Sequence, residues 1–408
     1  MTTEDSWNAA TRVAHDRRRE PIHRSEGGAR VMPGEGADDR LADLGPESRE
    51  AGLRIAPGCY ATGDGIAADL HDYLRTEDDL SNVLIAGGET ALDVARGEVE
   101  RSLDTLGVEY EAVTLEGECT PDRVSEYREV VEGVDPDVLV GLGGGKALDT
   151  AKLIAEGNCP VALLPTVAST CAAWTPLSVV YDEDGSHLGA VRLSRCPEWV
   201  LVDTGIIARA PSRLLAAGVM DATAKHFETA YIPEGEMRKP AQWGTGVAQE
   251  SYRSCLRDDA AEAIAACERG ELTETVEDVI DACIAGPGLT AGLLGGQSHL
   301  LLGHVFCYRL REDDAVRERS YHGERVAYGV LLFQLLMGEG EGRVAELKEW
   351  YESFGPELSL ESLGLTAVDE RVVSDLARAI DDGADYDLVE REISYEGVRD
   401  AIRTIESM

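Results

Sequence analysis

The chain has 408 residues, enough to form two domains with separate hydrophobic cores. It carries 77 acidic and 38 basic side chains, which give a formal net charge of −39. Such acidity repels polyanions, so nucleic acid and anionic membranes are excluded as expected partners. Only five basic residues are lysines, and this spread acidity predicts a halophilic protein, whose self-repulsion concentrated salt screens; an ordinary acidic protein is the alternative.

The nine cysteines are scattered along the chain without any CxxC spacing. This pattern favours reduced thiols over a disulfide framework or a zinc knuckle. No N-terminal segment has the apolar core of a signal peptide, and the most apolar stretch, residues 326–337, is too short to cross a bilayer. We therefore expect a soluble cytoplasmic protein.

Residues 1–52 are rich in arginine, acidic residues and glycine and contain a single aromatic residue, Trp7. This composition cannot bury enough apolar surface to offset the entropy of the chain. We expect a disordered extension, or a stretch upstream of the true start of the protein.

From residue 53 to residue 205, short apolar runs alternate with helical patterns. The runs predict strands at residues 83–86, 110–115, 138–142, 161–164 and 200–202, with helices between them, for example at 91–106 and 121–132. This alternation predicts an α/β domain with a largely parallel sheet. A hairpin is expected over residues 177–191. The segment from 206 to 408 is predicted to be an all-helical domain, with helices at 216–231, 242–269, 276–284 and 324–338.

The most informative segment is Val138–Lys152, in which an apolar β-branched run leads into Gly143-Gly144-Gly145 and a helical pattern. Consecutive glycines let the backbone turn sharply and approach a ligand closely. The start of the helix offers free N–H groups and the positive end of its dipole, which suit a phosphate. We predict a nucleotide or phosphate site, with a plain strand-to-helix turn as the alternative. Asp149 suits the first turn of this helix.

Three of the eight histidines, His299, His304 and His322, fall within 24 residues. Asp221 lies in a small-residue helical segment, where a lone carboxylate requires a partner. One carboxylate and two imidazoles that leave a coordination position open are typical of a catalytic metal site. The spacing alone also allows a core aspartate and polar histidines near the start of a helix.

Together these segments resemble the iron-containing alcohol dehydrogenase superfamily, in its glycerol dehydrogenase and hydroxycarboxylate dehydrogenase branch. The resemblance covers about residues 55–340, and the segments that carry it are residues 143–152, 165–181, 201–204, 208–211, 216–221 and 322–329. The stretch Thr170–Ser178 is especially similar to the hydroxycarboxylate subgroup, because Cys171 stands where glycerol dehydrogenases usually carry an aspartate.

The resemblance implies a Rossmann-like α/β nucleotide-binding domain followed by an all-α metal-binding domain, the architecture of dehydroquinate synthase, with the active site between them. It implies that Asp221, His304 and His322 hold one divalent metal, with zinc expected and iron as the alternative, which acts as a Lewis acid. Hydride would pass between the substrate carbon and the nicotinamide of NAD or NADP. A homo-oligomer is expected. The residues implied at the cofactor are Gly143, Gly144, Gly145, Lys146, Asp149, Thr166, Ser169, Thr170, Thr175, Leu177 and Tyr181.

Three departures from the family pattern stand out. His299 and His304 are five residues apart, whereas the family's two histidines are three or four apart. Counting back from His322 favours His304 as the ligand and puts Cys307 in place of the second histidine. Met220 replaces a glycine before the metal aspartate. Gly88 stands where NAD-preferring relatives often carry an acid, which makes NADP use plausible.

The expected reaction interconverts a small polar alcohol and its carbonyl, either glycerol and dihydroxyacetone or a 2-hydroxy acid and its 2-oxo acid. Cys171 favours the 2-oxo acids. Lys225, one turn beyond Asp221, is a candidate to bind a substrate carboxylate, or else an exposed helix lysine. Two other functions remain open: a carbon–oxygen lyase of the dehydroquinate-synthase type, and a non-catalytic nucleotide-binding relative.

Overall fold

The computed structural model describes residues 41, 44, 53–75, 77, 80–232, 235, 237–295, 302–365, 368, 370–383 and 393–408. The extension expected over residues 1–52 therefore lies outside the described residues, apart from Leu41 and Leu44. His299 also lies outside them. No helix among the described residues is long and apolar enough to cross a membrane.

A six-stranded parallel sheet with the order β1-β8-β5-β4-β2-β3 forms the first part of the fold. Its strands are β1 (Cys59–Gly63), β2 (Asn82–Gly87), β3 (Glu109–Thr114), β4 (Val138–Gly143), β5 (Val161–Pro165) and β8 (Trp199–Asp203). All five strands expected from the sequence are present. Every residue of β4, β5 and β8 is buried, as the continuous apolar runs of a parallel sheet covered on both faces require.

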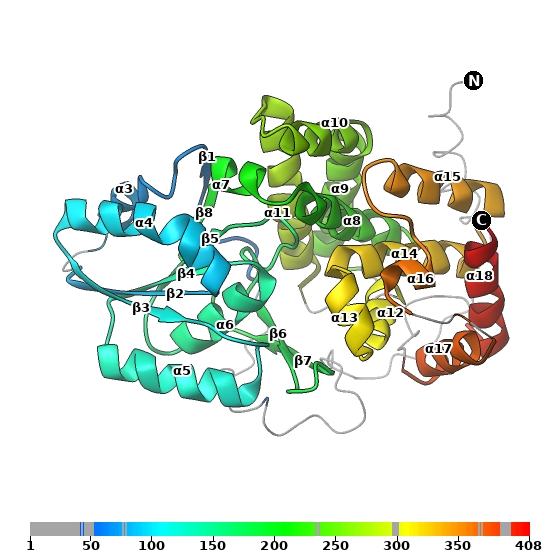
Figure 1. Ribbon diagram of the computed structural model, residues 1–408, viewed down its shortest axis with the longest axis horizontal. Helices are drawn as coiled ribbons and strands as arrows, with labels where there is room; N and C mark the ends of the chain where they lie inside the picture. Colours follow the sequence, from blue (N-terminus) through cyan, green and yellow to red (C-terminus); the bar gives the residue numbers. More distant parts are fainter. Residues whose placement is uncertain are drawn as a thin grey trace. The chain divides into compact units, whose positions relative to one another are not determined.

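Helices connect the strands and cover the sheet. They are α3 (Leu70–Leu74), α4 (Glu89–Leu106), α5 (Pro121–Val134) and α6 (Gly145–Ala155). Figure 1 shows α3 and α4 on one face of the sheet and α5 and α6 on the other. Because the strands are parallel, Gly143 at the end of β4 pairs with Pro165 at the end of β5. The glycine turn after β4 and the loop after β5 (the β5 loop), which belongs to the resembling segment 165–181, thus leave the sheet side by side at its carboxyl edge.

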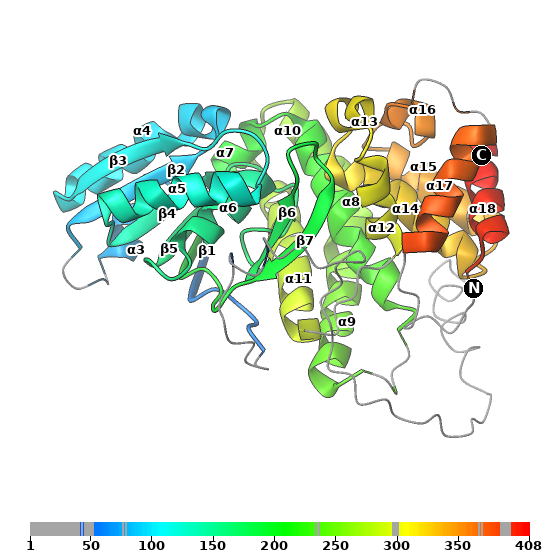
Figure 2. The same ribbon diagram turned by 90° about the horizontal axis from the view of Figure 1, so that it is seen from below.

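The expected hairpin is present as an antiparallel pair, β6 (Leu177–Tyr181) and β7 (His187–Arg192). Its turn contains Gly185, which has a φ of +84°. Figure 2 shows the hairpin extending toward α12 and α13, and the guanidinium of Arg311, just after α12, donates a hydrogen bond to the Gly185 carbonyl oxygen.

After β8 the described chain contains only helices, as expected. They are α7 (Thr204–Arg209), α8 (Ser212–Thr229), α9 (Lys239–Ser251), η1 (Tyr252–Leu256), α10 (Arg257–Glu268), α11 (Glu274–Leu294), α12 (Leu302–Leu310), α13 (Asp314–Arg319), α14 (His322–Leu336), α15 (Glu341–Glu352), α16 (Leu360–Leu363), α17 (Glu370–Gly383) and α18 (Tyr395–Ser407). The helix expected at 242–269 is interrupted by the π-helical turn η1. The domain boundary at residues 205 and 206 stays a prediction, consistent with this change from strands to helices.

Candidate active site

Three side chains from separate helices meet in the helical part. Asp221 lies in the middle of α8, His304 near the start of α12, and His322 is the first residue of α14. Asp221 Oδ1 is 3.5 Å from His304 Nε2 and 3.2 Å from His322 Nε2. One ligand atom from each residue lies within 4.8 Å of the others, a spacing that a single metal ion can bridge.

The chemistry of this cluster fits a divalent metal. Asp221 is buried, and its Oδ1 has no hydrogen-bond partner among the described residues. A buried carboxylate oxygen without a partner is costly unless something positive binds it. One oxygen and two imidazole nitrogens suit zinc or iron and leave at least one coordination position for a substrate oxygen.

Charge interactions within the cluster change its pKa values. Burial raises the pKa of Asp221, but the neighbouring His304 and His322 imidazoles outweigh burial and hold that pKa well below the usual range. Burial lowers the pKa of His322, but Cys307 and Asp221 together raise it to about 10. Burial also lowers the pKa of His304, but the negative charge of Glu228 outweighs burial and raises the pKa of His304 above its usual value. The cluster stabilises positive charge, which a bound metal would supply in place of protons.

Glu228 is a functional candidate that the sequence reasoning missed. It is only 1% exposed, and both of its carboxylate oxygens lie 3.1 Å from His304 Nδ1. A carboxylate on Nδ1 fixes the imidazole so that Nε2 faces Asp221, the usual support for a metal-binding histidine. Asp221, Lys225 and Glu228 are spaced i, i+4, i+7 on one helix, and this spacing was the signal available in the sequence.

Cys307 supports the other histidine. Its Sγ lies 3.4 Å from His322 Nδ1, and the thiol also donates to the His322 carbonyl oxygen. Burial raises the pKa of Cys307, but His322 and Arg325 overcome this and lower it to about 6. The residue that replaces the family's second histidine therefore contacts a candidate ligand directly. Met220, the other departure beside Asp221, is fully buried, and its methyl group leaves no room for a side chain at Gly355.

Main-chain contacts position these helices. A β-carbon at Gly218 of α8 would overlap the carbonyl oxygen of Ala168, in the loop that follows β5. One residue earlier, the carbonyl oxygen of Ala217 occupies the place of a β-carbon at Gly323, next to His322. Glycine is therefore required at both positions, and it allows the β5 loop, α8 and the start of α14 to contact one another through their backbones.

The glycine turn has the predicted geometry. Gly143 has a φ of +149° and Gly144 is the N-cap residue of α6. No side chain of the described residues caps the free N–H groups at that end of the helix. A β-carbon at Gly144 would lie 3.1 Å from Val167, and one at Gly145 would lie 3.3 Å from Thr170 Oγ1. The turn and the β5 loop are thus in close contact. Lys146 extends from the turn and donates to Glu118 Oε1 at 3.1 Å.

The placement of Asp149 in the first turn of the helix was wrong, because α6 begins at Gly145 and puts Asp149 in its second turn. There it is buried, 2.9 Å from Lys152 Nζ, and accepts a hydrogen bond from the Val179 N–H. The Lys152 ammonium also donates to the carbonyl oxygens of Ala172, Thr175 and Leu177. The Asp149–Lys152 pair therefore holds the end of the β5 loop and the start of the hairpin.

The remaining predicted residues lie on the loop and the hairpin beside the turn. Thr166 and Thr175 are buried, Ser169 and Thr170 are half-buried, and Leu177 and Tyr181 are the first and last residues of β6. Cys171 lies half-buried on the loop that follows β5. Burial raises its pKa to about 11, against an opposing effect of Lys225. Lys225 itself is half-buried, and no ion pair of its ammonium occurs within the described part of the chain.

Comparisons with known proteins agree with this arrangement. The family model "Iron-containing alcohol dehydrogenase" matches residues 57–204. A glycolaldehyde reductase from Halobacterium salinarum is 30% identical over 363 residues, which cover 86% of this chain and 96% of the relative. Hydroxycarboxylate dehydrogenase A from Escherichia coli is 31% identical over 74% of this chain and 82% of its own length. The crystal structure of glycerol dehydrogenase from Schizosaccharomyces pombe superimposes with a TM-score of 0.78, at 25% identity, over 88% of this chain and 91% of the other.

These relatives span nearly the whole described fold and include both branches that the sequence resembles. They do not favour a lyase or a non-catalytic protein. The chain belongs to the iron-containing alcohol dehydrogenase family and is a metal-dependent alcohol oxidoreductase.

Proposed function

We propose that Asp221, His304 and His322 hold one divalent metal, with zinc as the expected ion, and that this site interconverts a small polar alcohol and its carbonyl. The observation that carries the proposal is the buried Asp221 Oδ1, which has no hydrogen-bond partner among the described residues and faces two imidazole Nε2 atoms. When bound, the metal supplies a Lewis acid that polarises the substrate oxygen. Glu228 and Cys307 orient the imidazoles of His304 and His322 through contacts with their Nδ1 atoms.

The dinucleotide is proposed to bind over the glycine turn. The free N–H groups at the start of α6 and the Lys146 ammonium suit its pyrophosphate. Ser169 and Thr170, on the loop packed against that turn, supply hydroxyl groups for the remaining contacts. No described atom lies within 4 Å of a β-carbon built at Gly88, the N-cap residue of α4, and glycine carries no charge. This residue therefore opposes a 2′-phosphate neither sterically nor electrostatically. We propose that the enzyme accepts NADP as well as NAD.

Lys225 and Cys171 favour a substrate that carries a carboxylate. Lys225 lies one turn beyond Asp221 on the same face of α8, and its positive charge acts to lower the pKa of both His304 and Cys171. A half-buried ammonium without an ion pair within the described residues can bind an anionic group beside the metal. We therefore rank 2-oxo acids above dihydroxyacetone and glycolaldehyde. The relatives of this chain include a hydroxycarboxylate dehydrogenase, a glycerol dehydrogenase and a glycolaldehyde reductase.

The test is NAD(P)H oxidation by the zinc-loaded enzyme in multimolar KCl, with 2-oxo acids, dihydroxyacetone and glycolaldehyde as substrates. Lys225→Gln should raise KM for a 2-oxo acid about tenfold or more and leave KM for the uncharged carbonyls unchanged. Lys239→Gln, an exposed lysine that pairs with Gln242, is the matched control. Equal loss for charged and uncharged substrates would exclude Lys225 as the carboxylate partner. Unchanged zinc content in Asp221→Asn would exclude the metal assignment, and loss of zinc without loss of rate would exclude a role of the metal in the reaction.

We further propose a homo-oligomeric cytoplasmic enzyme that works in concentrated salt. The net charge of −39 with only five lysines supports the salt requirement. Sedimentation in multimolar KCl measures the oligomer directly.

A further inference from the structure

Arg311 reaches from the helical part of the molecule to the nucleotide-binding part. It follows α12, one turn beyond Cys307, and its side chain is 8% exposed. Its Nη1 donates to the Gly185 carbonyl oxygen in the hairpin turn, and its guanidinium lies 3.8 Å from the centre of the Tyr181 ring. Its Nη2 donates to Glu118 Oε2 at 2.8 Å.

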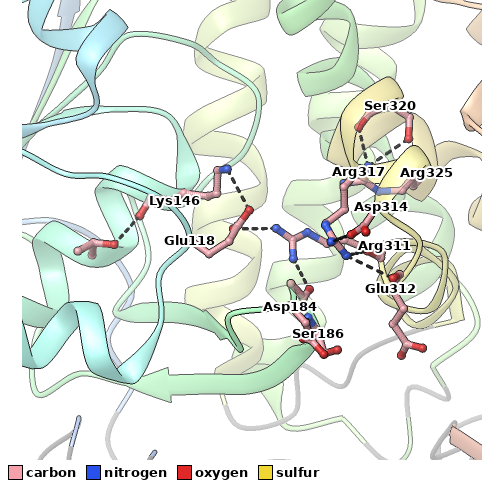
Figure 3. Close-up of polar contacts among 12 residues, drawn as sticks. Glu118, Lys146, Asp184, Ser186, Arg311, Glu312, Asp314, Arg317, Ser320 and Arg325 are labelled. Atoms are coloured by element: carbon pink, nitrogen blue, oxygen red, sulfur yellow. Dashed lines mark hydrogen bonds and ion pairs between the residues drawn. The ribbon is translucent and has the colours of Figure 1, made fainter.

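Glu118 connects this guanidinium to the glycine turn. While Oε2 accepts from Arg311, Oε1 accepts from Lys146 Nζ at 3.1 Å. Figure 3 shows the Glu118 carboxylate between the two cations, with Lys146 arriving from α6 and Arg311 from the opposite side. The Lys146 side chain is 58% exposed, so it can still reach a ligand seated on the turn.

The charges of this triad decide what a phosphate would meet at the turn. Lys146 contributes one positive charge, which the Glu118 carboxylate alone would cancel. Arg311 restores a net charge of +1 because its guanidinium neutralises the same carboxylate. In a chain with a net charge of −39, one uncompensated acid beside the phosphate site would oppose an anionic cofactor.

We propose that Arg311 is a positioning residue of the dinucleotide site: it neutralises Glu118 and thereby leaves the positive charge of Lys146 available to the cofactor pyrophosphate. This inference rests on the proposed binding of a dinucleotide over the glycine turn. It also means that the segment directly after the His304 helix contributes to cofactor binding, through a residue 193 positions away from its partner Glu118 in the sequence.

The experiment compares NADH binding, measured by nicotinamide fluorescence, in five full-length variants and the wild type. At the lowest KCl concentration at which circular dichroism shows all proteins folded, Arg311→Met should raise the dissociation constant about tenfold, because the triad becomes neutral. Glu118→Gln should bind NADH at least as tightly as the wild type. The double variant Glu118→Gln with Arg311→Met should return to within about threefold of the wild type, because its net charge is again +1. Arg311→Lys should retain binding although it loses the guanidinium stacked on Tyr181.

A purely structural role for Arg311 predicts a different pattern. If Arg311 only fastened the hairpin turn, removing Glu118 would not rescue Arg311→Met, and the double variant would bind as weakly as the single one. That result, or unchanged binding in Arg311→Met, would overturn the inference. If Arg311→Met does not fold, weaker NADH binding in Glu118→Gln refutes the charge argument and tighter binding supports it. Failure of the wild type to bind NADH would instead overturn the proposed function itself. Arg309→Met, which removes a neighbouring arginine paired with Glu312, is the control.

Discussion

Glu228→Gln should weaken metal binding at the candidate site. In the structure both carboxylate oxygens lie 3.1 Å from His304 Nδ1, in a position that is 1% exposed. The glutamine keeps one acceptor oxygen but removes the negative charge that makes Nε2 a stronger ligand. Carboxylates behind metal-binding imidazoles contribute about 10- to 100-fold to affinity, which corresponds to about 1.4–2.8 kcal/mol. Because the hydrogen bond survives in part, we expect a loss near tenfold.

The assay is a competition titration of zinc against a chromophoric chelator, at alkaline pH so that protons compete little for the imidazoles. Urea unfolding of the metal-free proteins measures stability separately. Glu406→Gln is the matched control, because its carboxylate accepts from the Tyr328 hydroxyl and the Leu360 N–H, outside the metal cluster. Zinc affinity within twofold of the wild type, in a Glu228→Gln protein that folds normally, would refute the claim that this carboxylate supports His304.

Three further predictions concern stability. Burial and Arg253 lower the pKa of His226 to about 4. The stability that this neutral imidazole gives the folded state is therefore fully present above the unfolded-state pKa of about 6.5, and it is lost as the pH falls from 6.5 toward 4. Urea unfolding at about pH 7 and pH 5 should therefore show a loss about 2 kcal/mol larger in the wild type than in His226→Phe; an equal loss would contradict this pKa. Transfer from about 3 M to about 0.2 M KCl should lower the unfolding temperature, since the charge of −39 is screened less; an unchanged midpoint would argue against salt adaptation. Gly218→Ala should cost at least about 2 kcal/mol and reduce zinc binding, because its β-carbon overlaps the Ala168 carbonyl, whereas Gly246→Ala, with open space around it, should be neutral or stabilising in the same assays.

The sequence predicted the elements whose local pattern is strong. β4 and β5 are continuous apolar runs and are fully buried, so their periodicity is unambiguous. β1 was missed because Cys59–Gly63 is a half-buried edge strand with a mixed sequence, paired only with β8. The π-helical turn η1 was also missed. Its residues, Tyr252–Leu256, include no proline or glycine that would mark an interruption of the helix in the sequence.

The residues of the candidate site also fall into those that the sequence predicted and those that only the structure shows. Asp221, His304 and His322 were named because their segments resemble a family, and the structure brings these three together. The partners behind them depend on tertiary packing. Glu228 and His304 are 76 residues apart in the sequence, and Glu118 and Arg311 are 193 apart. A local sequence pattern cannot predict contacts at such separations. Asp149 was assigned to the wrong helical turn because a count from the glycines does not reveal which residue forms the first turn.

The contacts of Gly218 with Ala168 and of Gly323 with Ala217 have a mechanical consequence. Since peptide groups touch without intervening side chains, no rotamer change can absorb a movement of the β5 loop. If that loop shifts when a dinucleotide arrives, α8 must shift with it, and Asp221 lies only one turn farther along that helix. With a dinucleotide bound over the glycine turn as proposed, these backbone contacts would fix the spacing between its nicotinamide and the metal cluster. Substitutions of the side chains around the site could therefore change which substrates bind there while this spacing stays the same.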